Sequence, residues 1–145
     1  MDKAYDLKRF TDAHKICFEN ALNEIKNGRK TSCWMWFIFP QIKGLGESST
    51  SALYAINDLK EARAYLQDEY LKNNTIEIIN ALLALPISNA TQIFGYPDNL
   101  KLRSSMTLFH YADPSEELFM KVLEKFYGGE PDGKTVEILK RERCI

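Results

Sequence analysis

The chain has 145 residues, of which 45% are hydrophobic and 27% charged, as in an ordinary single globular domain. Nineteen basic residues against twenty acidic ones give a net charge of -1, which excludes a protein-wide basic surface for nucleic acid or anionic membrane and leaves only a local patch. No apolar run is long enough to cross a membrane, and the start MDKAYDLKR is not a secretory signal, so we expect a cytoplasmic single domain over residues 1–145, with its core at about 6–142.

Residues 6–27 have the spacing of an amphipathic helix that ends before Gly28. Its apolar side carries Phe10, His14, Cys17, Phe18, Ala21 and Ile25. Because His14 lies on that side, we expect it to be a core histidine satisfied by one hydrogen bond. Glu24 and Asn20 are expected to face water.

Residues 31–41, TSCWMWFIFPQ, hold both tryptophans of the chain, and Pro40 ends their apolar run. A strand over 32–39 would be apolar on both faces, and it would lack a partner because almost nothing else has strand character, so we expect a short buried helix. The aromatic side chains are then simply core residues. Alternatively, Trp34 and Trp36 form one wall of a ligand pocket, since tryptophan is seldom wholly buried and needs a partner for its N–H.

Proline, glycine and capping residues divide the rest of the chain into short helical stretches. Asp58 and Glu61 have the spacing of a capping box, Ser88 and Asp98 stand at expected N-caps, and Gly95 ends a helix. The expected helices cover residues 51–56, 58–66, 75–85, 88–94, 98–111, 116–127 and 134–141. The pattern predicts an all-α fold, a single compact domain of seven or eight short helices joined by tight loops.

The helix after Pro97 is a candidate anion site. Lys101, Ser104 and Ser105 share one side of this helix, near an N-terminus whose free N–H groups and dipole favour negative charge. In the alternative interpretation Asp98 caps the helix, Lys101 is solvated, and the two serines are small packing residues.

Gly44-Leu45-Gly46 follows the aromatic run and predicts a turn. It lacks the further glycine and the preceding strand of a dinucleotide fingerprint, which favours a plain turn over a phosphate cradle. Gln41 both donates and accepts hydrogen bonds, so Gln41, Gly44 and Gly46 would suit the mouth of a pocket. Glu61 is a helix-capping residue, or a candidate general acid or base if it is buried beside that pocket.

The cysteine and histidine content gives no sign of a metal site. Cys17, Cys33 and Cys144 are odd in number and lack metal-ligand spacing, and the two histidines lie far apart. We expect free thiols, no metal and no cofactor. Cys33 has no histidine beside it in sequence, so a thiol nucleophile has little support.

Two stretches, WMWFIFPQIKGLG and DNLKLRSSMTLF, resemble a bacterial family known as domain of unknown function 1810. The likeness runs from DLKRF through YAINDLKEARAYL to FYGGEPDGKTVEIL and so spans nearly the whole chain. The resemblance implies a mainly helical fold, and the family's name assigns no function. The family usually has a histidine immediately before Trp-Met-Trp, where this chain has Cys33, so no role that needs an imidazole there is expected.

The chain is also similar, more distantly, to the NADAR group of small helical proteins, which hydrolyse N-glycosidic bonds of nucleotide-like or ADP-ribose-like substrates. The shared features are size, helical content, aromatic residues and a helix rich in lysine and hydroxyl groups. The Glu-His motif of that group is not recognisable before Tyr54, so the similarity leaves the catalytic carboxylate unassigned. It ranks functional hypotheses only by analogy.

Three functional hypotheses follow from these features. The first is an enzyme acting on a nucleotide-like or ADP-ribose-like substrate, as in N-glycosidic bond hydrolysis, with Asp98 or Glu61 acting on water or on the leaving group. The second is a non-catalytic module that binds the same phosphorylated ligand, and the third is a protein-interaction domain with no small-molecule site. The ligand-binding residues of the first two are Trp34, Trp36, Gln41, Gly44, Gly46, Lys101, Ser104 and Ser105. Both require a pocket that joins residues 34–41 to residues 98–105.

Overall fold

The computed structural model describes residues 5–45 and 49–145, and helices dominate this part of the chain. The helices are α1 (Lys8–Lys26), α2 (Met35–Ile38), α3 (Ser49–Tyr54), α4 (Leu59–Gln67), α5 (Glu69–Ala84), α6 (Ala90–Phe94), α7 (Asp98–Ala112), α8 (Leu118–Tyr127) and α9 (Gly133–Arg141). The described residues form no strand, and their one isolated parallel bridge joins Ile42 to Ile56. The predicted all-α class is confirmed, with nine helices in the described ranges instead of seven or eight. None of these helices is both long enough and apolar enough to span a bilayer.

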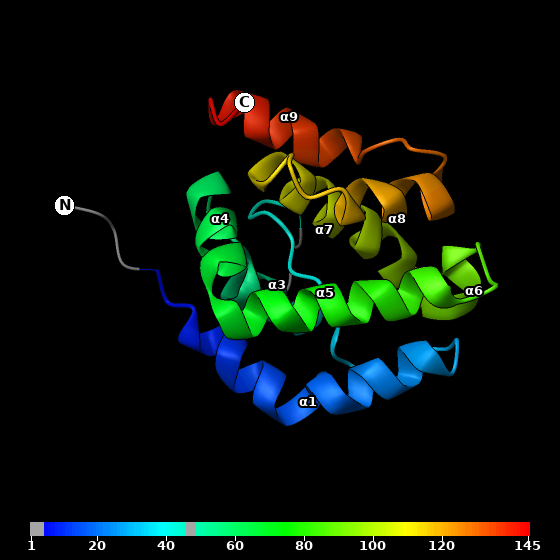
Figure 1. Ribbon diagram of the computed structural model, residues 1–145. Helices are drawn as coiled ribbons and strands as arrows, with labels where there is room; N and C mark the ends of the chain where they lie inside the picture. The colour runs from blue at the N-terminus through cyan, green and yellow to red at the C-terminus, as the bar shows by residue number, and fades with distance from the viewer. Residues whose placement is uncertain (1–4, 46–48) are drawn as a thin grey trace.

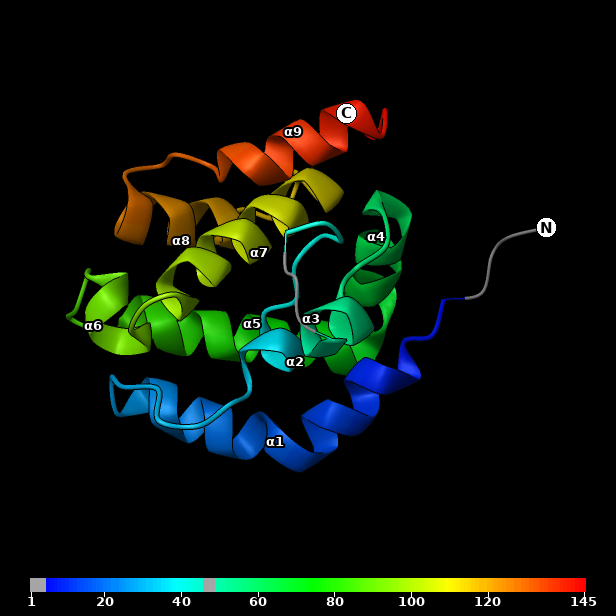
Figure 2. The ribbon, with the colours of Figure 1, turned by 180° about the vertical axis from the view of Figure 1, so that it is seen from behind.

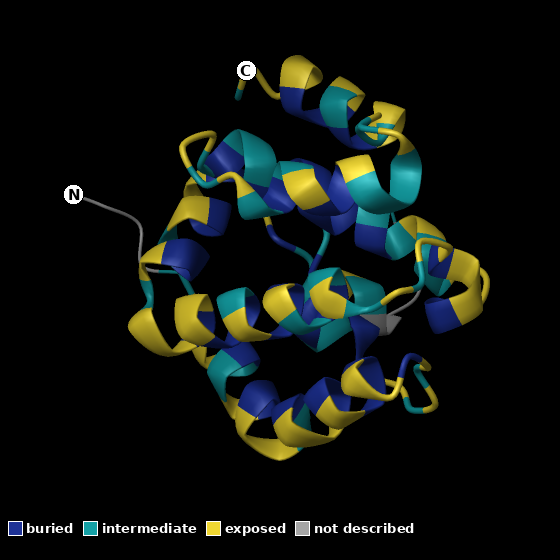
Figure 3. Ribbon diagram, turned by 45° about the vertical axis from the view of Figure 1, so that its right-hand side comes forward, coloured by how far each residue is buried: buried dark blue, intermediate teal, exposed yellow. Residues whose placement is uncertain are grey.

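Helices α5 and α7 are central to the packing. α5 packs against α1, α4 and α8, while α7 contacts α4, α6, α8 and α9. Figure 1 shows the resulting layers, with α1 at one edge, α5 beside it, and α7, α8 and α9 beyond. Buried residues line the helix faces that turn toward one another, and exposed residues lie on the outer faces (Figure 3). One hydrophobic cluster, running from Phe10 in α1 to Leu139 in α9, forms the core.

Side-chain caps determine where four of the helices begin. Asp58, Asp68, Asn89 and Asp132 each accept a hydrogen bond from a backbone N–H three residues on, at the starts of α4, α5, α6 and α9. Asp68 caps α5, so the expected start of this helix at residue 75 is wrong by six residues. The expected cap at Ser88 is also wrong, since its neighbour Asn89 fills that role.

The apolar run of residues 31–41 forms one helical turn, α2, within the core. Trp34, Met35, Ile38 and Phe39 are each 1% exposed, whereas Trp36 is half-buried. The short buried helix expected from the sequence is confirmed, although it covers residues 35–38 rather than 32–39.

Two backbone hydrogen bonds bring α3 next to α2. Lys43 N–H donates to the carbonyl of Ile56, and Ile56 N–H donates to the carbonyl of Gln41, each at 2.8 Å. These bonds hold the chain that follows α3 against the chain that follows α2. Figure 2 shows α2 and α3 side by side, on the face of the molecule between α1 and α7.

Candidate functional site

A cavity of about 210 Å³ lies between α2, the segment that follows it, and α3. Its lining residues on the α2 side are Trp36, Gln41, Ile42, Lys43 and Gly44, and on the α3 side they are Ser51, Ala52, Tyr54 and Ala55. No carboxylate, imidazole or thiol is among these described lining residues. Aromatic and aliphatic walls with an amide, an ammonium and hydroxyl groups are the composition of a small-molecule binding site.

Tyr54 anchors the α3 wall of this cavity to the core. Its ring centroid is 4.6 Å from that of Phe37, with an angle of 72° between the ring planes, and 6.1 Å from that of Phe10. The steep angle to Phe37 is the edge-to-face geometry that aromatic pairs prefer. The α3 wall is therefore held against both α2 and α1.

Glu24 fixes the loop that leads into α2. Its carboxylate accepts hydrogen bonds from the backbone N–H groups of Thr31 (2.5 Å) and Ser32 (3.0 Å), and from the indole N–H of Trp34 (3.0 Å). Asn20 and the Ser32 hydroxyl also donate to it. The expectation that Glu24 faces water is therefore wrong, because the chain after Gly28 folds back over it and leaves it buried.

These hydrogen bonds also control the charge of Glu24. Burial by itself would raise the pKa of the carboxyl, but the bonds donated by Ser32, Thr31 and Trp34 stabilise the ionised form and lower the pKa to about 2. Glu24 therefore stays ionised at neutral pH and holds the Trp34 indole in place.

Asp98 links two lysines, each of which lies over a tryptophan ring. Its carboxylate is 2.8 Å from Lys30 Nζ and 3.1 Å from Lys101 Nζ. Lys30 Nζ lies 5.3 Å from the Trp34 ring centroid, and Lys101 Nζ lies 4.5 Å from that of Trp36, within the range of cation–π attraction. The predicted capping role of Asp98 is wrong, because Pro97 is the N-cap of α7 and makes no side-chain cap bond.

The two serines of the expected anion site lie inside α7. Ser104 Oγ donates to the carbonyl of Leu100 at 3.2 Å, one turn earlier in the same helix. Ser105 is fully buried, and its Oγ has no hydrogen-bond partner among the described residues. Neither serine lines the cavity beside Trp36, so the structure supports their interpretation as small packing residues.

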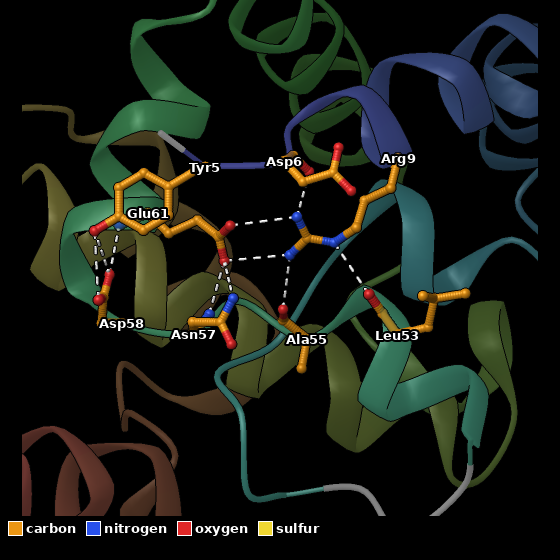
Figure 4. A network of polar contacts seen from close by, with 8 residues as sticks. All are labelled: Tyr5, Asp6, Arg9, Leu53, Ala55, Asn57, Asp58 and Glu61. Atoms are coloured by element: carbon orange, nitrogen blue, oxygen red, sulfur yellow. Dashed lines mark hydrogen bonds and ion pairs between the residues drawn. The ribbon is translucent and has the colours of Figure 1, made fainter. Parts of the chain in front are cut away.

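Glu61 belongs to a buried ion-pair network near the C-terminal end of α3 (Figure 4). It is 0% exposed, and its Oε1 is 3.2 Å from Arg9 Nη2 and accepts from the backbone N–H of Asn57 at 2.8 Å. One of the two hydrogen bonds of the expected capping box is present, because the Asp58 carboxylate accepts from the backbone N–H of Glu61 at 2.8 Å.

Arg9 connects this network to the C-terminal end of α3. Its Nε donates to the carbonyl of Leu53 at 3.0 Å, and its Nη2 donates to that of Ala55 at 2.9 Å. Arg9 also donates to the carbonyl of Asp6 (Figure 4). A guanidinium at a helix C-terminus satisfies carbonyls that have no partner within the helix. Glu61 thus supports the cavity indirectly, through Arg9 and α3, and does not line it.

The structure brings together only part of the expected binding set. Trp36, Gln41 and Gly44 line the cavity, and Lys101 contacts the Trp36 ring. Trp34 lies in the core, and Gly46 lies outside the described residues. The wall facing Trp36 comes from α3, whereas the pocket expected from the sequence had residues 98–105 in that place.

The remaining titratable candidates, His14 and Cys33, do not line the cavity. His14 is buried, and its ring nitrogens contact the Phe37 carbonyl (2.9 Å), the Tyr65 hydroxyl (3.0 Å) and the Asn74 amide (3.1 Å), where the sequence predicted one hydrogen bond. Cys33 is exposed. Across residues 5–45 and 49–145, no three His, Cys, Asp or Glu side chains are grouped so that they could hold a metal ion.

Comparisons with known proteins place this fold in a family. A family model described as a protein of unknown function, DUF1810, matches residues 4–139. The crystal structure of the conserved hypothetical protein Rv1873 from Mycobacterium tuberculosis is 42% identical, with a TM-score of 0.91, over 94% of this chain and 97% of that one. No curated protein matched the sequence. The match over nearly the whole length shows that the chain belongs to the DUF1810 family.

Proposed function

We propose that the protein binds a small ligand through a planar ring that enters the cavity between α2 and α3. The observation that carries this proposal is the half-buried Trp36 ring, which borders a cavity of about 210 Å³ together with the Gln41 amide. A half-buried indole beside an amide suits a nucleobase-like ring, because the indole can stack and the amide can pair with a polar edge.

The size of the cavity limits which part of a ligand it accepts. Sites for drug-sized ligands typically have volumes of ~300–1,000 Å³, and this cavity is smaller. It would therefore hold one ring system, and a sugar or phosphate attached to the ring would lie outside. Lys43 also lines the cavity and is exposed, so it can meet an anionic group there.

Binding fits the described cavity better than hydrolysis does. Hydrolysis of an N-glycosidic bond, the reaction of the NADAR group, requires a group that activates water or assists the leaving base. Glu61 is committed to Arg9 and Asn57, and Asp98 to two lysines, and neither lines the cavity. ADP-ribose-like compounds therefore enter the proposal as ligands rather than as substrates.

The proposal is tested by thermal shift and calorimetric titration with nucleosides, nucleotides, ADP-ribose and NAD. A ring-bearing compound that binds the folded state raises the melting temperature, and Trp36→Ala or Gln41→Ala abolishes the effect. Gln67→Ala, on an exposed part of α4, is the matched control and retains binding.

Chromatography of the same mixtures distinguishes a binder from an enzyme. We expect no release of free base, and release would replace the binding proposal with hydrolysis. If no ring compound binds, or if binding survives in Trp36→Ala, the cavity is not a ligand site.

A further inference from the structure

A groove whose charged lining residues are both basic lies at the end of the molecule where α6 meets the connection between α1 and α2. Residues 25–46 contain no aspartate or glutamate and carry Lys26, Arg29, Lys30 and Lys43, and residues 78–97 contain no charged side chain at all. The C-terminal end of α1 and the residues that directly follow it lie beside α6 in both views (Figures 1 and 2), whereas Lys43 lies at the cavity beside Trp36. A protein with a net charge of -1 thus has a local basic surface.

The groove has a volume of about 540 Å³. Arg29 and Lys30 line one wall, and Thr91 and Gln92 line the other. The walls are joined at the base, where the backbone N–H of Lys30 donates to the carbonyl of Ile93 at 2.8 Å. This hydrogen bond fixes the backbone of Lys30 against α6.

The positive charges exceed the negative ones beside this groove. Asp98 is shared between Lys30 and Lys101, so one carboxylate faces two ammonium groups. Arg29 is exposed, and within the described ranges no carboxylate forms an ion pair with it. The guanidinium of Arg29 is therefore free to make a bidentate contact with a phosphate.

An exposed aromatic side chain adds a second feature. Tyr96 directly follows Gly95, a residue of the groove wall, and is 78% exposed. Proteins that bind single strands combine a basic groove for the backbone with aromatic rings on which bases stack. An acidic peptide would use the cations but has no regularly spaced bases to stack on the phenol ring.

We propose that this groove, lined by Arg29 and Lys30 and flanked by Lys101 and Tyr96, binds the phosphodiester backbone of single-stranded nucleic acid. One phosphate would meet the exposed Arg29 guanidinium, the excess positive charge of Lys30 and Lys101 over Asp98 would attract the neighbouring phosphates, and a base would stack on Tyr96. The proposal does not depend on the occupancy of the cavity beside Trp36, because it uses other residues.

Fluorescence anisotropy with a labelled ten-nucleotide oligothymidine at 50 mM salt tests this proposal. Each phosphate contact is worth about five- to tenfold in affinity at this salt concentration, so Arg29→Gln should weaken binding by about that factor. Arg29→Gln with Lys30→Gln should weaken it further than Arg29→Gln alone and flatten the salt dependence. Tyr96→Ala should cost about fivefold or more.

The control removes the same charge elsewhere. Lys60→Gln with Lys72→Gln, both exposed and outside the groove, should change affinity less than about twofold. Arg29 is exposed and has no ion-pair partner to lose, so its single variant remains informative if Lys30→Gln disturbs Asp98. The proposal is overturned by absence of binding at 50 mM salt, by equal losses in groove and control variants, or by polyglutamate competing as well as the oligonucleotide at equal charge.

Discussion

Glu24 illustrates how one buried carboxylate organises its surroundings. Five donors converge on it, from Asn20, Thr31, Ser32 (twice) and Trp34. Each charge-assisted hydrogen bond is stronger than a neutral one, and together they orient the loop that carries Trp34 and leads to Trp36. The position of the cavity wall therefore depends on a residue that does not touch the cavity.

Replacing Glu24 with glutamine should destabilise the fold at neutral pH by roughly 3 kcal/mol, because the folded state holds the carboxyl pKa at about 2 against an ordinary value of 4.5. A lowered carboxyl pKa contributes stability above the ordinary value, and this contribution is lost as pH falls from about 4.5 towards 2. Urea unfolding of wild type and variant should therefore converge near pH 2. Glu19→Gln, on the exposed side of α1, is the control, and a pH-independent difference for Glu24→Gln would contradict the assignment.

His14 should make stability depend on pH in a different window. Burial lowers its pKa to about 4, against a smaller opposing effect of the bond to the Phe37 carbonyl. Between pH 6.5 and 4 the unfolded chain binds a proton that the folded chain does not. The free energy of unfolding therefore decreases as the pH is lowered, by roughly 2 kcal/mol from pH 6.5 to pH 5. His14→Gln should remove this slope. Retention of the slope in the variant would show that another group causes it.

At the scale of secondary structure, local patterns predicted helices better than they predicted the site. The spacing of apolar residues and glycines located α1 and α8 to within two residues. Helix α2 was harder, since a run that is apolar on every side has no periodicity to read. The site was predicted only in part, because Trp36, Gln41 and Gly44 are neighbours in sequence whereas the opposite wall, α3, is placed by contacts between distant residues.

Arg9 is an example of a contact that the sequence does not reveal. Its partners Leu53, Ala55 and Glu61 lie 44 to 52 positions away, and nothing in the local pattern of α1 marks it. The same holds for Lys30 and its partner Asp98. Long-range ion pairs obey no spacing rule, so a single sequence contains no signal for them.

Arg9→Met should cost ~3–5 kcal/mol of unfolding free energy, because it leaves the fully buried Glu61 charge unpaired. It should also accelerate hydrogen exchange in α3, whose last carbonyls lose their donor, before exchange in α5 changes. Lys8→Met, which removes the exposed pair with Asp12 one residue earlier, is the control and should have little effect. Equal effects of the two variants would show that Arg9 does not anchor α3.

At the scale of the whole molecule, the net charge of -1 conceals an uneven distribution of charge. The cavity beside Trp36 and the basic groove beside α6 are connected by side-chain contacts through Lys101, Asp98 and Lys30. Both features depend on the segment from Arg29 to Gly44, which folds back over α1.

The central claim, that Trp36 borders a ligand cavity while Trp34 belongs to the core, is tested most directly by nuclear magnetic resonance. The chain has two tryptophans, so a ¹⁵N-labelled sample gives two indole N–H signals, which Trp36→Phe assigns. Titration with nucleosides should shift the Trp36 signal and the Gln41 side-chain amide. The Trp34 signal should stay in place, because its N–H donates to Glu24 inside the core. A shift of Trp34 alone, or no shift of Trp36 with any ring-bearing compound, would contradict the account.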